Sequence, residues 1–365
     1  MKKSLAFVLA LVLCLGMLSA CGNGGSAPAA TNAPAAPAAP AGDAAPAATE
    51  AAITYESMVI AVGTTGAAED ISTKAMEYMA QYLSDKTGGA MTIDLFPSSQ
   101  LGNASAMMEM VQQGALDIML EGNYMNSYGV SDAKAGSVSF LNKSKEMYRA
   151  LNESDVKKDW ERQFEELNGI HILNDAFYRN GTCFVSNKKV ETLADMKGLK
   201  VRVPPSQIVI QCYEALGMAP TPIAYSESLL SLQQGVVDAI WCTEDAAYTM
   251  GFYEVAKYLI ELNTDQDSMY LYTNAAMYNG LGENERAALE EAAAAAAEYY
   301  SGLADEQLRT NVQKMKDAGI EVITLTPETI DEIWQTNLPV ARQFEANGEW
   351  SEGLLDKVLE ATGQK

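Results

Sequence analysis

The strongest candidate for chemistry in this sequence is Arg202, because its neighbours place a guanidinium where α/β proteins bind ligands. Residues 199–203 (LKVRV) alternate apolar and basic side chains, which predicts a strand with Arg202 at its carboxyl end. Pro204 and Pro205 end the strand, and Ser206 can cap the helix that follows. Ligands bind open α/β sheets at this edge, and a guanidinium can hold a carboxylate there by two parallel hydrogen bonds. The alternative is a solvated arginine on an amphipathic strand.

The charge of the chain limits the partners that it can have. Its 365 residues include 48 acidic and 25 basic side chains, which gives a formal net charge of −23. Such a chain repels nucleic acid and anionic bilayers, so we expect no nucleic-acid partner. A small anionic ligand is still compatible with this charge, because surface charges are screened beyond about 8 Å at physiological salt. That ligand would need local positive charge such as Arg202.

The N-terminal residues indicate export. Residues 1–20 read as a signal peptide with a basic start and an apolar stretch that is too short to span a membrane. The peptide ends in Leu-Ser-Ala-Cys, which resembles the bacterial lipobox and implies cleavage before Cys21 and a lipid on its sulfur. Residues 21–52 are rich in alanine and proline and read as a disordered tether. The alternative is an ordinary signal peptide with an incidental cysteine. We therefore expect an extracytoplasmic protein anchored to the cell membrane through Cys21.

Strands and helices alternate from residue 53 onward, which is typical of an α/β fold. Residues 57–63 and 92–96 read as strands, and residues 69–87 and 104–113 read as helices that end at glycines. Residues 284–318 predict a helix about 50 Å long, which could run along two lobes. Parallel strands joined by helices are therefore expected in at least the first part of the chain.

An internal repetition suggests two matching α/β units. Residues 112–117 (QQGALD) recur as residues 233–238 (QQGVVD), each time where a helix ends and a short apolar strand follows. The residues after these two strands would then face each other across a cleft: Leu120, Glu121, Gly122 and Asn123 from one unit, and Trp241, Cys242, Thr243 and Glu244 from the other. The alternative is that these are ordinary strand-to-helix loops, with Trp241 filling the core.

The residues needed for catalysis are scarce. The single histidine, His171, lies in an apolar strand pattern and is interpreted as structural. The sequence has no nucleophile elbow, phosphate loop or metal-spaced cluster, so we expect no enzyme, no metal and no cofactor. Glu69 and Glu121 could pair as carboxylates, but their separation is open. Whether Cys183 and Cys242 pair is also open.

Several separated motifs resemble one transport family. Residues 86–89 (KTGG) and 93–102 (IDLFPSSQLG) resemble the N-terminal signature of DctP-type solute-binding proteins of TRAP (tripartite ATP-independent periplasmic) transporters. The second half resembles the family at residues 193–202, 215–217, 220–223, 232–238 and 253–258. The resemblance implies a two-lobed, class II periplasmic-binding-protein fold with hinge strands and a long helix that spans both lobes.

The resemblance also implies lobe boundaries and a function. Lobe I would be residues 53–180 plus about 268–307, and lobe II residues 181–267 plus about 308–365. The protein would capture a small organic acid and deliver it to the small and large membrane subunits of a TRAP transporter, with Arg202 clamping the carboxylate. Two other roles fit such a fold: the binding component of an ATP-driven importer, or a ligand-sensing lipoprotein.

The sequence departs from the family pattern at two positions. Cys183 stands where many members have a second arginine, for which nearby Arg179 could substitute, and Cys242 stands where many have a ligand-binding asparagine. Trp241 is similar to a branch that binds 2-oxo acids, and with Tyr248 it favours a monocarboxylate with an apolar or aromatic body. The expected ligand contacts are Arg202, Arg179, Trp241, Cys242, Glu244, Tyr225, Glu121, Asn123, Glu69 and Tyr178.

Overall fold

The computed structural model describes residues 53–262 and 264–365. The signal peptide predicted for residues 1–20, the lipid attachment predicted at Cys21 and the tether predicted for residues 21–52 lie outside the described residues. None of the described helices combines the length and the apolar character needed to cross a membrane.

The first lobe is built on a five-stranded sheet. It contains β1 (Met58–Thr64), β2 (Met91–Phe96), β3 (Ile118–Glu121), β4 (Ile170–Tyr178) and β10 (Ser268–Asn274), in the order β2-β1-β3-β10-β4. Strand β1 is parallel to β2 and β3, whereas β10 is antiparallel to β3 and β4. The two strands predicted at residues 57–63 and 92–96 are confirmed as β1 and β2, within one residue at each end.

The second lobe is built on a six-stranded sheet. It contains β5 (Thr182–Ser186), β6 (Lys200–Val203), β7 (Ala219–Pro222), β8 (Ala239–Thr243), β9 (Tyr258–Glu261) and β11 (Glu321–Thr324), in the order β11-β9-β5-β8-β6-β7. Strand β6 lies parallel to β7 and β8, and β5 is antiparallel to β8 and β9. Arg202 occupies the carboxyl end of β6, as the alternation predicted.

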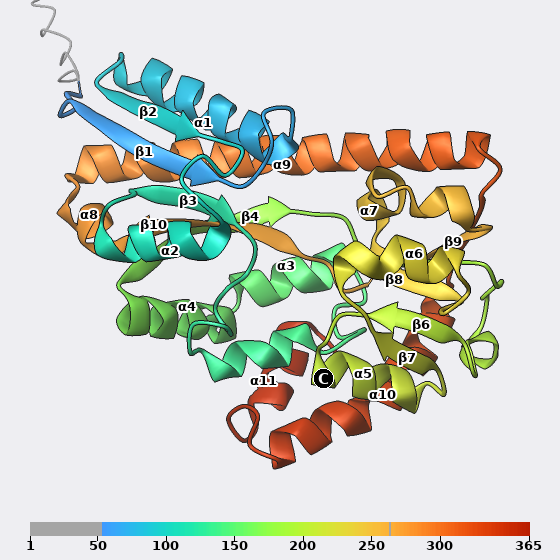
Figure 1. Cartoon of the computed structure of the whole chain (residues 1–365). Coiled ribbons are helices and arrows are strands. Elements are labelled where there is room, and N and C mark those ends of the chain that lie inside the picture. The colour runs from blue at the N-terminus through green and yellow to red at the C-terminus, as the bar shows by residue number, and fades with distance from the viewer. Residues whose placement is uncertain (1–52, 263) are drawn as a thin grey trace, which may run out of the picture. The chain divides into compact units, whose positions relative to one another are not determined.

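Helices cover both sheets (Figure 1). The α-helices before the long helix are α1 (Ile71–Thr87), α2 (Ala104–Gln113), α3 (Lys145–Glu153), α4 (Asp155–Asn168), α5 (Gln207–Ala215), α6 (Ser228–Gln233), α7 (Glu244–Thr249) and α8 (Ala275–Gly280). Short 3-10 helices lie between them: η1 (Ser131–Ser137), η2 (Leu193–Met196), η3 (Tyr225–Glu227) and η4 (Phe252–Val255). Helix α2 has the predicted bounds, because Asn103 caps its first turn and Gly114 ends it in the left-handed conformation.

Helix α9 (Glu283–Asp317) is the long helix that the sequence predicted. It packs against α1 and β4 of the first lobe and against α7 of the second, and it runs along both in Figure 1. Its buried alanines join the apolar core of the first lobe, where their small side chains permit close packing. The expected two-lobed α/β fold with a helix spanning both lobes is confirmed.

The last two helices pack against earlier parts of the chain, and α11 returns to its first half. Helix α10 (Pro327–Ala346) packs against α5, and α11 (Leu354–Ala361) packs against η1, α3 and α4. The backbone N–H of Ser351 donates to Asp132 Oδ1 at 2.8 Å, and Gln364 Nε2 donates to the Leu141 carbonyl at 2.9 Å. The C-terminal segment, which the sequence places in lobe II, is therefore fastened to helices that it places in lobe I.

Candidate ligand-binding cavity

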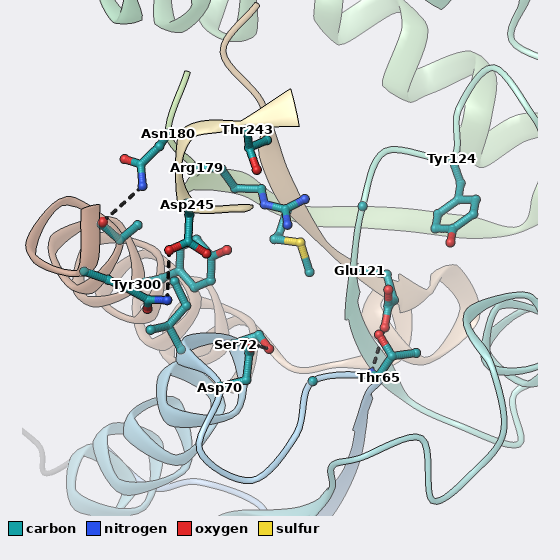
Figure 2. A pocket seen from close by; sticks show the side chains of 16 residues that line it. Thr65, Asp70, Ser72, Glu121, Tyr124, Arg179, Asn180, Thr243, Asp245 and Tyr300 are labelled. Atoms are coloured by element: carbon teal, nitrogen blue, oxygen red, sulfur yellow. Dashed lines mark hydrogen bonds between the residues drawn. The ribbon is translucent and has the colours of Figure 1, made fainter. Parts of the chain in front are cut away.

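A cavity of about 380 Å³ lies where the ends of strands from both sheets meet α9. The first lobe contributes the turn after β1 and the end of β3, and the second contributes the end of β8 and the start of α7 (Figure 2). The lining side chains include Thr65, Asp70, Ser72, Glu121, Tyr124, Arg179, Asn180, Thr243, Asp245, Tyr300 and Gln307. The volume suits a small molecule, because ligand pockets commonly measure about 300–1,000 Å³.

Arg179 is the guanidinium that extends into this cavity (Figure 2). It follows β4, and its backbone N–H donates to the Asp267 carbonyl at 2.8 Å, which fixes where the side chain starts. The guanidinium makes one ion pair among the described residues, from Nη1 to Asp267 Oδ2 at 3.4 Å. A guanidinium has five N–H donors, so most of them are available to a ligand.

Three carboxylates line the same cavity, and each already accepts a hydrogen bond. Asp70 Oδ1 accepts from the Ser72 backbone N–H at 2.8 Å, as the N-cap of α1. Glu121 Oε1 accepts from the Thr65 backbone N–H at 2.8 Å. Asp245 Oδ1 accepts from Asn311 Nδ2 at 2.7 Å, and burial raises the pKa of this carboxyl against the effect of that bond. These contacts hold the carboxylates in place while leaving further lone pairs for the hydroxyl groups of a ligand.

Arg202 is not solvated, so the solvated-arginine alternative is wrong. The residue is only 4% exposed, and the ring of Tyr225 in η3 lies over its guanidinium. Nε donates to the Ile223 carbonyl at 3.0 Å, and Nη1 reaches the Trp241 carbonyl at 3.5 Å. No carboxylate of the described residues forms an ion pair with this guanidinium. Burial of a cation is costly when its partners are neutral carbonyl groups, so this guanidinium favours an anionic partner.

Tyr225 lies over Arg202, and neither residue lines the 380 Å³ cavity. The guanidinium carbon of Arg202 lies 5.3 Å from the centroid of the Tyr225 ring. Burial raises the pKa of the Tyr225 hydroxyl to about 12, while Arg202 and Arg179 both act to lower it. Arg202 itself does not line the 380 Å³ cavity.

Two other predicted contacts line a different cavity. Trp241 and Asn123 belong to a second cavity of about 400 Å³, of which Thr243 is shared with the first. Asn123 Nδ2 donates to the Tyr270 hydroxyl at 3.2 Å. The indole N–H of Trp241 is buried and has no acceptor among the described residues. The aromatic ring that was expected against the ligand thus lines the 400 Å³ cavity and not the 380 Å³ cavity.

Glu244 and Cys242 are buried inside the second lobe. Glu244 is 3% exposed and lines a smaller cavity with Asn180 and Gly181, and burial raises its pKa to about 8. Cys242 faces Cys183 on the neighbouring strand, with 3.8 Å between the two Sγ atoms. Neither side chain lines the 380 Å³ cavity.

The structure does not bring three of the expected residues to the cavity. The side chain of Glu69 is 93% exposed and pairs with Lys74 at 3.5 Å, so it cannot pair with Glu121. Tyr178 packs edge-on against Tyr148 beneath Arg149. Tyr248 stacks on Tyr253 away from the cavity. None of the expected aromatic residues lines this cavity, whose aromatic side chains are Tyr124 and Tyr300 instead.

Sequence reasoning missed Asp70, Asp245 and Tyr300. Asp70 gave a local signal, because an aspartate before an amphipathic run is a common N-cap. Asp245 directly follows the predicted contact Glu244, and the helical turn at that point turns Asp245 toward α9. Tyr300 gave no signal, because it is one aromatic residue within a long alanine-rich helix.

Comparison with known proteins agrees with this architecture. The family model for bacterial extracellular solute-binding proteins, family 7 (DctP), matches residues 62–347. The 2,3-diketo-L-gulonate-binding periplasmic protein of Escherichia coli is 31% identical over 245 residues, which cover 66% of this chain and 74% of that protein.

Solved structures extend the comparison to the fold. A TRAP periplasmic solute-binding protein from Ochrobactrum anthropi has a TM-score of 0.77 and 24% identity, covering 85% of this chain and 96% of that one. A TRAP periplasmic solute-binding protein from Chromohalobacter salexigens with bound D-glucuronate has a TM-score of 0.69 and 26% identity, covering 83% and 99%. The chain belongs to the DctP family of bacterial extracellular solute-binding proteins, which serve TRAP transporters.

Proposed function

We propose that this chain captures a small hydroxylated monocarboxylic acid in the 380 Å³ cavity and delivers it to the membrane subunits of a TRAP transporter. The observation that carries the proposal is the guanidinium of Arg179, which lines the cavity and forms one ion pair among the described residues. The buried guanidinium of Arg202 does not line this cavity and has no carboxylate partner among the described residues, and it would join the site as the lobes close on the ligand. An organic anion would supply the missing negative charge by the bidentate hydrogen bonding that arginine favours.

The rest of the cavity favours hydroxyl groups on the ligand. Asp70, Glu121 and Asp245 accept hydrogen bonds but would repel a second carboxylate. Arg179 offers donors for a carbonyl or hydroxyl oxygen. The ligands named for two relatives, 2,3-diketo-L-gulonate and D-glucuronate, each combine one carboxylate with several oxygen functions. A sugar acid therefore fits better than the aromatic monocarboxylate or a C4-dicarboxylate.

Ligand capture would close the two lobes on each other. Arg202 and Tyr225 belong to the second lobe, whereas Asp70 and Glu121 belong to the first. A ligand that touches both sets binds the closed form more tightly and shifts the population toward it. The proposed moving parts are residues 53–180 with about 268–307, and residues 181–267 with the chain after about residue 308. Helix α11 is the exception and would move with the first part, because it packs against η1, α3 and α4.

Binding without chemical conversion is part of the proposal. The only histidine of the sequence, His171, holds Glu165 through Nδ1 at 2.7 Å and stacks on Tyr278, and it does not line the cavity. The cavity thus contains no histidine, the side chain that most often acts as a general base. Recovery of the ligand unchanged after prolonged incubation, by mass spectrometry, checks this point.

The N-terminal proposal is separate. We propose that a lipid on Cys21, after cleavage behind residue 20, anchors the protein to the outer side of the membrane, because members of the family are periplasmic. The intact mass of the protein from the membrane fraction tests whether Cys21 carries a lipid. In a second test, a Cys21→Ser substitution should release the protein into the soluble fraction without changing ligand affinity.

A thermal-shift panel tests the binding proposal. Hexuronates and aldonates should raise Tm by several degrees, since ligand at 100 times Kd adds about 2.7 kcal/mol to the free energy of unfolding. Neutral hexoses of the same size should give no shift. Arg202→Gln should abolish the shifts, because loss of a buried charged partner costs about 2–5 kcal/mol of binding.

Arg149→Gln is the matched control. Arg149 also lies over a tyrosine, 4.8 Å from the centroid of the Tyr178 ring, but it does not line the cavity. Its replacement should leave every shift unchanged. Equal shifts with Arg202→Gln and wild type, or equal shifts with neutral sugars and sugar acids, would overturn the proposal.

A further inference from the structure

Cys183 and Cys242 are positioned to react with each other. They are direct partners in the antiparallel pairing of β5 with β8, so both side chains point to the same face of the sheet. Their Sγ atoms are 3.8 Å apart, and the side chains are 0% and 5% exposed. Directly opposed residues of antiparallel strands have Cα atoms about 4.5 or 5.5 Å apart, which lies within the range of disulfide bonds. Side-chain rotation, without backbone movement, would therefore bring the sulfurs together.

The third described cysteine provides no competing partner. Cys212 lies on α5 in the apolar cluster on the other side of the second sheet, whereas Cys183 and Cys242 share a cluster with Val185 and Ile240. Among the described cysteines, Cys183 and Cys242 are thus the only pair in contact.

We propose that Cys183 and Cys242 form a disulfide bond in the exported protein. Proteins of this family work outside the cytoplasm, where disulfides persist. One cysteine thiolate attacks a disulfide of the export compartment, either of a protein oxidant or of a small molecule, and displaces one thiol. The second cysteine then attacks that mixed disulfide and displaces the other thiol. The two cysteines lose two electrons and two protons, and the oxidant is reduced to two thiols.

The bond would fasten the strand that supports the cavity. Thr243 follows Cys242 directly and lines the cavity, and the pair Thr182–Thr243 is the next rung of the same ladder. The cross-link closes a loop between positions 59 residues apart, which restricts the unfolded chain strongly. It leaves Arg202 and Tyr225 chemically unchanged, so it does not depend on the proposed ligand.

Peptide mapping of the full chain tests the inference. Cells that export the protein are quenched in acid, free thiols are blocked with N-ethylmaleimide, and the protein is digested with trypsin and a glutamyl endopeptidase. The second enzyme is needed because no lysine or arginine separates Cys212 from Cys242, whereas Glu214 and Glu227 do. The expected products are a linked peptide pair containing Cys183 and Cys242, and a blocked Cys212.

Stability gives an independent readout. A reductant should lower the Tm of the wild type by several degrees and leave the Cys183→Ser/Cys242→Ser variant unchanged. Cys212→Ser should respond to reductant like the wild type. Recovery of Cys183 and Cys242 as blocked thiols, or linkage of either to another cysteine such as Cys21, would overturn the inference, whatever the protein binds.

Discussion

The guanidinium of Arg202 lies beneath the ring of Tyr225, with 5.3 Å between the guanidinium carbon and the ring centroid. Tyr225 is itself 43% exposed, so one surface ring separates a buried cation from solvent. The electron-rich face of the ring partly compensates the charge that burial penalises. This relationship gives Tyr225 a role that depends on its ring and not on its hydroxyl.

Tyr225→Phe should therefore bind ligand within about twofold of wild type, because the ring that covers Arg202 is kept. Tyr225→Ala should raise Kd about 5- to 30-fold, since a cation–π contact with a desolvated cation contributes about 1–2 kcal/mol. Isothermal titration calorimetry with the best ligand of the thermal-shift panel measures both values. Loss of binding in Tyr225→Phe would point instead to a hydrogen bond from the hydroxyl.

Arg179→Gln should weaken binding about 10- to 100-fold, because hydrogen bonds to a charged donor contribute about 1.5–3 kcal/mol. The substitution should leave the backbone at this position in place, because the hydrogen bond from the residue 179 backbone N–H to the Asp267 carbonyl does not involve the guanidinium. The same calorimetric titration measures the effect, with Arg149→Gln as the unaffected control. An unchanged Kd would confine ligand recognition to Arg202.

Local patterns predicted the elements of this fold well. The alternation in residues 199–203 and the two prolines after it predicted β6 and the place of Arg202. Helical patterns followed by glycine predicted α2 completely and α9 to within one residue at each end. Such signals depend on neighbours in sequence, so one chain is enough to recognise them.

The composition of the cavity could not be predicted in the same way. A strand alternation places Arg202 on the polar face, but its burial depends on tertiary contacts such as the one with the Tyr225 ring. Glu69 and Asp70 are adjacent in sequence, yet one is exposed and the other caps α1 and lines the cavity. Trp241 and Cys242 are adjacent in β8, so their side chains necessarily point to opposite faces.

Glu244→Gln should make stability less dependent on pH. The folded protein keeps a proton on this buried carboxyl up to about pH 8, whereas an unfolded glutamate loses it near pH 4. Between these values the folded state binds more protons than the unfolded state, so wild-type stability falls as pH rises. The fall from this one group is at most about 1.4 kcal/mol per pH unit.

Urea unfolding between pH 5 and pH 9 measures that difference. The variant and the wild type should be most alike near pH 5, and the variant should be relatively more stable at pH 9. Glu69→Gln is the control, because its side chain is 93% exposed and its replacement should shift the curve little at any pH. If the curves of stability against pH were parallel for wild type and Glu244→Gln, Glu244 would be ionised in the folded protein or would be compensated by a nearby cation.

Lys157→Met should be the most destabilising of these substitutions. Lys157 is 2% exposed, and its Nζ contacts Asp175 and lies 2.9 Å from Glu161 Oε1. Burial opposes the ammonium charge, but Asp175 and Glu161 hold its pKa above the ordinary value for lysine. Without the ammonium group, two carboxylates remain in a half-buried site with no cation to compensate their charge. The expected loss is about 3–5 kcal/mol, measured by urea unfolding at pH 7.

Lys145→Met is the control that distinguishes the effect of burial from the effect of losing an ion pair. Lys145 pairs with Asp305 at 2.9 Å, but both side chains are partly exposed, so its replacement should cost about 0–1 kcal/mol. Adding Asp175→Asn to Lys157→Met should recover part of the loss, because it removes one of the uncompensated charges. Equal losses for Lys157→Met and Lys145→Met would mean that the site around Lys157 is hydrated enough to screen its ion pairs.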